Sequence, residues 1–233
     1  MDPPGTAPLR GLHLLQERYS DRILTGLTVL LLLMMFVIAP LQAADVLVFE
    51  GFGLVVALMM ALGVLVMSRS RIAFTLIAVA IVMNGTGAVL RLHRLSTLDV
   101  YLVSGAWLLT ALTLGWVVAR QVFAKGRVSF HRIIGAVLLY LLIALFFVAA
   151  FAFLGLFIPD AFQGIKIEDS TSLASNLIYF SFVTLTSTGY GDIVPVHPLA
   201  RSLCNLETII GQLYPATLLA RLVTLELEGR AKT

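Results

Sequence analysis

The segment 186–192, which reads Thr-Ser-Thr-Gly-Tyr-Gly-Asp, is the part of the chain whose residues could do chemistry together. Its alternating glycines, Gly189 and Gly191, allow backbone dihedral angles that other residues reach only with strain. An extended strand of this kind can direct successive carbonyl oxygens toward one axis, and those oxygens can replace the water shell of a cation. The segment therefore predicts a path for a partly dehydrated cation.

A short apolar run, 173–185, directly precedes this segment. A helix needs about 20 apolar residues to cross a bilayer core of about 30 Å, so this run cannot span it. Because non-helical backbone at membrane depth must be buried in protein or line a water-filled path, we expect a re-entrant pore helix. The hydroxyl groups of Ser170, Thr171 and Ser172 are expected to cap its start. Its partially negative C-terminal end would then point at the cation path.

The stretch 179–195, Tyr-Phe-Ser-Phe-Val-Thr-Leu-Thr-Ser-Thr-Gly-Tyr-Gly-Asp-Ile-Val-Pro, resembles the signature of the potassium channel superfamily, whose usual filter reads Thr-Val-Gly-Tyr-Gly. The similarity continues through 206–223, so it covers the part of the chain from 133 onward. The preceding part resembles the six-transmembrane, one-pore prokaryotic-type channels only in the number and placement of its helices. The resemblance implies a potassium-selective ion channel whose selectivity filter is 186–192.

The resemblance also gives a role to each filter residue. Two positions depart from the usual pattern, since Ser187 replaces threonine and Thr188 replaces valine, which adds a hydroxyl behind the filter. Neither change removes a carbonyl, but both leave open how far sodium permeates. Potassium is the ion carried, and no organic cofactor is expected. The implied roles are carbonyl donors to potassium at Ser187, Thr188, Gly189 and Tyr190, the Ser187 hydroxyl at the innermost site, an exit turn at Gly191, and filter support from Thr186 and Asp192.

The number of filter segments predicts the assembly. One chain contributes one segment, whereas a potassium-sized ring of carbonyls needs four. The minimal channel is therefore a homotetramer with a fourfold axis through the pore. Its other partner is membrane lipid.

The composition agrees with a membrane location. Hydrophobic residues make up 59% of the 233 residues, charged residues make up 12%, and the mean hydropathy is +0.98. A soluble domain carries about a quarter charged residues. The formal net charge of +3 is spread over short connectors, which argues against a nucleic-acid partner. The single Cys204 excludes an intrachain disulfide and is expected to pack as a small hydrophobic residue.

Six apolar runs are long enough to cross the bilayer, although the last contains several charged residues. They predict an all-α membrane protein with six transmembrane helices plus a re-entrant pore helix and a selectivity-filter loop. The predicted spans are 23–39, 46–67, 72–90, 98–119, 133–158 and 199–227.

The spans divide the chain into four parts. The two amphipathic parts mix apolar and basic residues and are interpreted as interfacial helices, with ordinary polar linkers as the alternative. The four helices before the pore occupy the place of a voltage sensor. The parts are a cytoplasmic N-terminal amphipathic segment 1–22, a four-helix accessory domain 23–119, an amphipathic linker 120–132, and a pore domain 133–233 with outer helix 133–158, pore helix 173–185, filter 186–192 and inner helix 199–227.

The distribution of lysine and arginine predicts the orientation, because these residues accumulate in cytoplasmic connectors. The basic residues at both ends of the chain, between the second and third spans and between the fourth and fifth, fall on one side. Both termini are then cytoplasmic, and we expect the protein in the plasma membrane. Three residues fall on the predicted outer side against this rule, namely Arg91, Arg94 and Arg201.

Three residues of the inner helix invite a functional interpretation. Pro215 lacks the N–H that would bond the Gly211 carbonyl and crowds the preceding turn, so a kink is expected. We interpret Gly211 and Pro215 as the hinge of an inner gate, with a static kink as the alternative. Glu207 is a carboxylate at membrane depth, where it needs a partner. It either bonds the back of the pore helix or faces a water-filled cavity and attracts cations.

Voltage sensing requires several arginines at three-residue spacing within a helix. The span 98–119 contains no lysine or arginine, and only Arg91 and Arg94 keep the spacing, at its outer approach. We therefore expect weak voltage dependence or none, with the two arginines as interfacial anchors.

These observations predict a potassium-selective channel that conducts passively. One alternative is a channel that passes sodium and potassium alike, because Ser187 and Thr188 loosen the filter. Another is a non-conducting regulatory subunit of a heteromeric assembly. An enzyme is not expected, because the four histidines are scattered and no nucleophile or base accompanies them.

Overall fold

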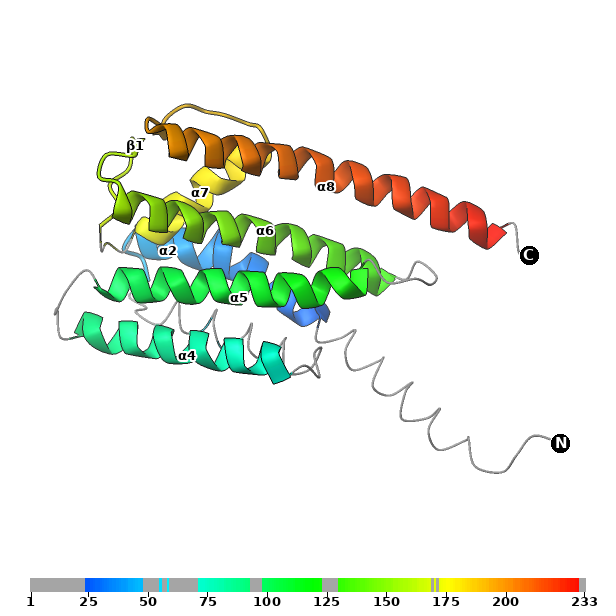
Figure 1. The fold of residues 1–233 in the computed structure, drawn as a ribbon, viewed down its shortest axis with the longest axis horizontal. Helices are drawn as coiled ribbons and strands as arrows, with labels where there is room; N and C mark the ends of the chain where they lie inside the picture. The colour runs from blue at the N-terminus through cyan, green and yellow to red at the C-terminus, as the bar shows by residue number, and fades with distance from the viewer. Residues whose placement is uncertain are drawn as a thin grey trace, which may run out of the picture.

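Helices make up almost all of the described protein (Figure 1). The computed structural model describes residues 24–47, 55, 58, 71–92, 98–122, 130–168, 170 and 172–230. The expectation of an all-α membrane protein is confirmed at this level. Within the described ranges, four helices are long and apolar enough to cross a membrane, namely Leu24–Ala43, Ile72–Leu90, Leu98–Arg120 and Ile133–Phe157.

Two of the six predicted spans differ from these four. Most of the run 46–67 lies outside the described residues, as do the segment 1–22, Arg94 and the linker residues 123–129. The run 199–227 is helical within α8 (Pro198–Arg230), but its charged residues make it more polar than the four apolar spans. The total of six transmembrane helices therefore stays a prediction.

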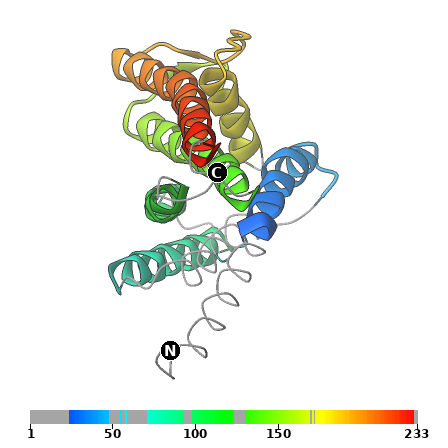
Figure 2. The ribbon, with the colours of Figure 1, turned by 90° about the vertical axis from the view of Figure 1, so that its right-hand side faces the viewer.

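The accessory helices form a layer beside the pore helices. α4 (Arg71–Leu92) packs against α5 (Leu98–Val122), and α5 packs along α6 (Phe130–Phe157), so that α5 lies in the middle (Figures 1 and 2). Gly87 permits the close approach of α4 and α5, because an added Cβ would lie 2.8 Å from Val103 Cγ2. Small residues let helices pack closely in membranes, where no hydrophobic force acts between apolar faces.

The first span, Leu24–Ala43, continues past the end predicted for it at residue 39. It contains a π-helical turn, η1 (Met34–Ile38), followed by α2 (Ala39–Ala43). Pro40 lacks a backbone N–H and crowds the turn before it. The residue before Pro40 therefore bonds a carbonyl five residues back rather than four. This π-turn absorbs the proline and keeps the helix intact.

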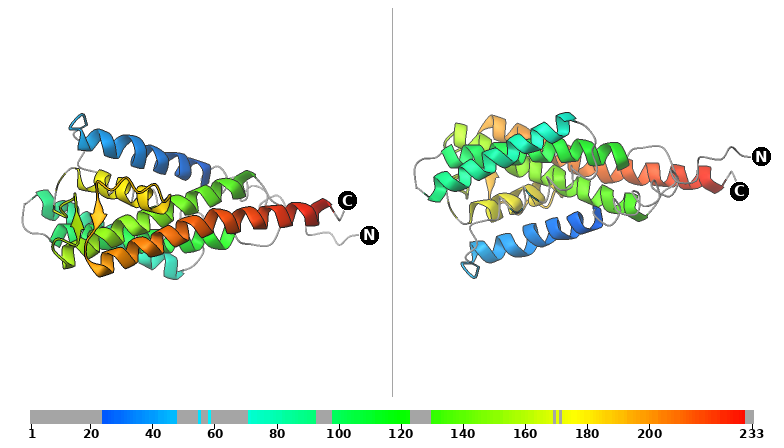
Figure 3. Two further views of the ribbon diagram at one scale, coloured as in Figure 1. Left: turned by 90° about the horizontal axis from the view of Figure 1, so that it is seen from above. Right: turned by 90° about the horizontal axis from the view of Figure 1, so that it is seen from below.

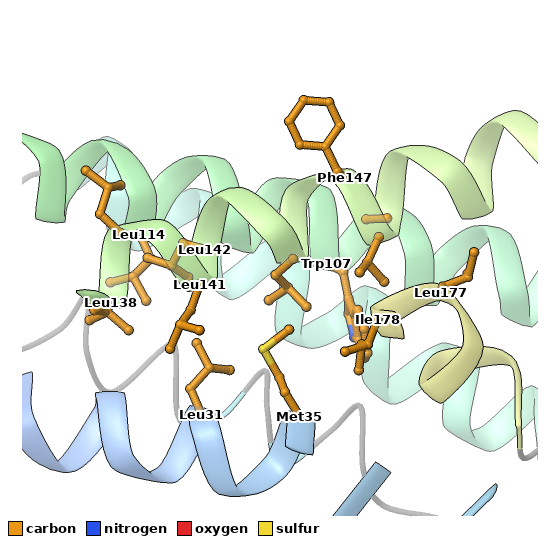
Figure 4. Close-up of a cluster of buried hydrophobic side chains, with 14 of the residues drawn as sticks. Leu31, Met35, Trp107, Leu114, Leu138, Leu141, Leu142, Phe147, Leu177 and Ile178 are labelled. Atoms are coloured by element: carbon orange, nitrogen blue, oxygen red, sulfur yellow. The ribbon is translucent and has the colours of Figure 1, made fainter. Parts of the chain in front are cut away.

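The first span packs on the pore domain. α2 contacts α7 (Leu173–Leu185), and the rings of Phe36 and Phe182 lie 4.9 Å apart between centroids. In both views of Figure 3, α7 lies between the first span and α8. Leu31 and Met35 point from this span toward the side chains of α6 in Figure 4, and both are 2% exposed. The hydrophobic core therefore joins the first span, the accessory helices and the pore helices.

The observed bounds of α7 are those of the predicted pore helix, Leu173–Leu185. Ser172 lies at its N-cap, but the expected capping bond is absent, because the Ser172 side chain pairs with the Ser170 hydroxyl at 3.3 Å. Thr171 lies outside the described residues. The Ser172 carbonyl still accepts the first helical bond, from the Asn176 N–H.

Two short strands join the loops that flank α7 and the segment 186–192. β1 (Phe162–Gln163) pairs antiparallel with β2 (Val194–Pro195). Gly164 follows β1 with φ of +89°, and an added Cβ there would lie 2.0 Å from the Asp192 carbonyl oxygen. Arg201 donates from Nε to the Pro195 carbonyl over 3.2 Å. Its position against the charge rule thus coincides with a bond to β2.

Candidate cation-binding site

The segment 186–192 begins where α7 ends, at Leu185, and contains no regular secondary structure. Its first turn bonds back to the helix, since the Thr188 N–H donates to the Val183 carbonyl over 2.8 Å. The strand that follows is therefore anchored on the C-terminal end of α7. That end carries the partially negative charge of the helix dipole.

Alternate residues of this strand have a left-handed backbone. The φ angle is +58° at Ser187, +62° at Gly189 and +84° at Gly191. When left-handed residues alternate with residues of negative φ, successive N–H groups turn to one side of the strand, and the carbonyl groups turn to the other. The backbone geometry therefore suits a row of carbonyl oxygens. Ser187 is not a glycine, so its conformation carries a steric cost of about 1–2 kcal/mol.

The strand is open on the surface of a single chain. Every residue of 186–192 is exposed, whereas Leu185 immediately before it is fully buried. Tyr190 is 71% exposed. The residues predicted to bind potassium are thus brought together on one strand, with room beside them for other molecules.

The C-terminal part of the strand contacts α7. The rings of Tyr179 and Tyr190 stack at 6.2 Å between centroids, with an interplanar angle of 2°. Desolvation, and then a hydrogen bond to the Asp192 carboxylate, raise the pKa of the Tyr179 phenol. Asp192 therefore interacts with a pore-helix residue of the same chain, and its role as filter support stays a prediction.

Two hydroxyl groups lie together at the start of the strand. Thr186 Oγ1 donates to the Phe182 carbonyl over 2.6 Å and lies 2.8 Å from Thr188 Oγ1. The hydroxyl that Thr188 adds in place of valine therefore has a partner. This contact restrains the strand, which is the opposite of the loosening expected from Thr188.

Glu207 of α8 lies against α7. Its side chain is fully buried, and the Ser181 hydroxyl donates to its Oε1 over 2.5 Å. Ser181 Oγ also lies 3.0 Å from the Ala144 carbonyl oxygen of α6, so three helices meet at this point. Of the two positions expected for Glu207, the structure shows the one behind the pore helix.

Three further contacts follow Glu207 along α8. Thr208 Oγ1 donates to the Thr184 carbonyl over 3.2 Å, and Gln212 Nε2 donates to Ser187 Oγ over 2.9 Å. Between them Gly211 approaches α7 so closely that an added Cβ would lie 2.0 Å from the Leu185 carbonyl oxygen. We call this set the pore seam. It consists of Ser181, Thr184, Leu185 and Ser187 on one side and Glu207, Thr208, Gly211 and Gln212 on the other.

Ser181, Thr208 and Gln212 were not predicted as functional residues. A signal was present, because residues 207, 208, 211 and 212 follow the one-face spacing of a helix. Small and polar residues on one face of a membrane helix mark a helix–helix contact. The sequence does not say which residues of α7 they meet.

The predicted hinge receives a second explanation. α8 is helical throughout Pro198–Arg230 with Pro215 inside it. Gly211 is required by the close approach to Leu185, whether or not the helix bends there. The hinge at Gly211 and Pro215 stays a prediction.

The fold and site together define a class of protein. Apolar helices long enough to cross a membrane pack around a short helix, which ends in an exposed strand with left-handed residues at Ser187, Gly189 and Gly191. This is the arrangement of an integral membrane protein that conducts ions.

Comparisons with known proteins place the chain within this class. Residues 137–227 match a family described as "Ion channel". The chain is also 31% identical over 126 residues to Protein LctB of Bacillus caldotenax, a match that covers 52% of this chain and 90% of LctB. No solved structure matches the chain. The chain belongs to the ion channel family.

Proposed function

We propose that the protein is a potassium-selective channel that conducts potassium passively through a filter formed by residues 186–192. One observation carries the proposal: left-handed φ angles at Ser187, Gly189 and Gly191, in a strand that starts from the end of a short apolar helix. This geometry supports rows of inward-facing carbonyls, which can replace the hydration shell of potassium.

Each filter residue then has a defined part in conduction. Thr186 and Asp192 support the strand through their contacts with α7, and Gly191 allows its outer exit turn. The C-terminal end of α7 adds a favourable field for a cation near the inner end. Potassium would bind at the carbonyl oxygens of Ser187, Thr188, Gly189 and Tyr190.

We further propose that four copies surround the pore. The exposed strand supports this assembly, because carbonyls on one chain surround only one side of an ion. α8 also carries an exposed apolar stripe, which a neighbouring copy would cover on the pore side and lipid on the other. The stripe contains Leu206 (49% exposed), Ile209 (54%), Leu213 (58%), Leu219 (64%) and Val223 (50%).

The proposal includes an orientation and a gating behaviour. Both termini would be cytoplasmic in the plasma membrane, and membrane lipid would cover the outer helices. Voltage dependence would be weak or absent, since Arg120 is the only lysine or arginine in the described helix α5. A conductance–voltage curve that is steep in the wild type and flat after neutralising Arg91 and Arg94 would reject this part.

The test is potassium flux into liposomes that contain only the purified protein. We expect rapid potassium uptake by the wild type, together with the mass of a tetramer in detergent. Gly189→Ala should abolish uptake, because φ of +62° is strained for alanine although nothing lies within 4 Å of the added Cβ. Absence of flux from a folded tetramer would favour the regulatory-subunit alternative. Equal sodium and potassium flux would favour the non-selective channel.

A further inference from the structure

Resting on the proposed function, we propose that Gln212 is a specificity-determining residue of the filter. Its side-chain amide holds the Ser187 hydroxyl in place, and that hydroxyl forms the floor of the innermost cation site. The inner helix would thus set which cations enter the filter from the inner side.

The geometry that supports this inference is a single bond between distant parts of the chain. Gln212 Nε2 donates to Ser187 Oγ over 2.9 Å, across a separation of 25 residues. Both side chains are exposed within one chain and lie at the inner start of the strand, where a cation would arrive. The bond therefore lies at the ion path itself.

The rest of the pore seam fixes the register that brings Gln212 to Ser187. Gly211 packs so closely against the Leu185 carbonyl that no Cβ would fit between them. The Thr208 hydroxyl donates to the Thr184 carbonyl. Gln212 is the next residue after this close contact. Its amide therefore meets Ser187 because two neighbouring backbone contacts hold α8 in place.

The chemistry of the hydroxyl explains why such a bond matters. A serine hydroxyl has one donor hydrogen and two acceptor lone pairs. The Gln212 amide occupies one lone pair, which leaves the other free to face a cation. Threonine, the residue usual at this position in the resembling family, is stiff at χ1 because it is branched at Cβ. Ser187 lacks that branch, and the amide supplies the restraint that is missing.

The bond also helps to hold a strained backbone. Ser187 has φ of +58°, a conformation that a non-glycine residue keeps only when its surroundings enforce it. The hydrogen bond from Gln212 to the Ser187 side chain is one contact that enforces this conformation. Loss of the tether would let the innermost site vary in size, so that it discriminates less between potassium and the smaller sodium ion.

The experiment is a double-mutant cycle on the purified channel in planar bilayers. The variants are Gln212→Met, which keeps side-chain length but removes the amide, Ser187→Ala, and the pair together. The readout is the potassium-to-sodium permeability ratio from reversal potentials in bi-ionic solutions. We expect Gln212→Met to lower this ratio about three- to tenfold, the scale of one hydrogen bond. The double variant should lie no lower than Ser187→Ala alone, because both changes remove the same interaction.

A control variant and an alternative to Gln212→Met keep the result interpretable. Gln163→Met removes an exposed amide from β1 and should leave the permeability ratio unchanged. If Gln212→Met does not assemble, Gln212→Asn, whose amide is too short to reach Ser187, should show the same fall. A folded tetramer of either Gln212 variant with the wild-type ratio would overturn the inference. A wild type that carries no potassium would instead reject the proposed function.

Discussion

The contact between α7 and α8 and the contact between α4 and α5 use different chemistry. Across the pore seam, side-chain hydroxyl, carboxyl and amide groups bond from one element to the other. In α4 and α5, the hydroxyl groups of Thr75, Thr110 and Thr113 bond carbonyls of their own helices. The two contacts therefore differ in how strictly they fix the register of the helices.

This difference separates two tasks. Among the described contacts, close packing such as that of Gly87 on Val103 holds α4 and α5 together and tolerates small shifts. Cross-helix polar contacts at membrane depth require particular atoms to meet, because an unsatisfied polar group there is costly. The pore domain uses the stricter chemistry where the open strand must be placed.

The largest effect is expected from Gly211→Ala. The added Cβ would lie 2.0 Å from the Leu185 carbonyl oxygen, which is backbone and cannot rotate away. We expect the free energy of unfolding to fall by about 3 kcal/mol, as for overpacked cores. Denaturant unfolding in detergent micelles measures it. The matched control is Gly85→Ala on α4, where nothing lies within 4 Å and alanine should add up to about 1 kcal/mol of stability. Equal effects of the two changes would erase the distinction between the contacts.

A smaller loss is expected from Ser181→Ala. This change removes the hydroxyl that donates to Glu207 Oε1, and Oε2 is already buried without a partner among the described residues. We expect a loss of about 2 kcal/mol, the cost of an unsatisfied buried polar group. Thr110→Val removes a buried hydroxyl that, among the described contacts, bonds the Ala106 carbonyl of its own helix, and should change stability by less than about 0.5 kcal/mol. The same unfolding assay compares them, and a larger loss for Thr110→Val would contradict the comparison.

Tyr214→Phe should cost about 1 kcal/mol, the usual scale of one hydrogen bond. The Tyr214 hydroxyl donates to the Ala136 carbonyl over 2.8 Å and so ties α8 to α6. Thr224→Val is the control, because Thr224 bonds only the Ala220 carbonyl within α8 among the described contacts. Thermal unfolding of the purified protein in detergent should separate the two variants. Identical melting temperatures would show that the α8–α6 bond contributes nothing.

The smallest effect is expected from Arg120→Gln at the end of α5. The guanidinium carbon lies 4.8 Å from the Trp116 ring centroid, and exposed cation–π pairs contribute about 0.5–1 kcal/mol. Stability should fall by about that amount, while the potassium-to-sodium permeability ratio stays at its wild-type value. A changed ratio would show that the accessory helices act on the filter.

The sequence predicted elements that depend on local pattern. The bounds of α7 follow from an apolar run between hydroxyl residues and a Thr-Ser-Thr-Gly stretch, and the positive φ angles at Gly189 and Gly191 follow from residue type. The first span was predicted to end at residue 39, directly before Pro40. A π-turn, which depends on the packing around it, carries the helix past that residue.

The pore seam could not be predicted in full, because it depends on tertiary register. Glu207 was expected to need a partner, but its partner Ser181 lies 26 residues away in the chain. Gln212 was not recognised, because the one-face spacing that it shares with residues 207, 208 and 211 indicates a helix contact but not which residue it meets. Ser187 was expected to keep the hydroxyl and lose a methyl group, which left sodium permeation open, and the sequence did not show that Gln212 donates to this hydroxyl.

The most direct measurement is the reversal potential of the purified wild-type channel between potassium on one side of a planar bilayer and sodium on the other. A filter of four carbonyl-lined strands predicts a strongly shifted reversal potential, of the sign set by potassium leaving its own side. A reversal potential near zero, with clear single-channel currents, would contradict the proposal that residues 186–192 select potassium.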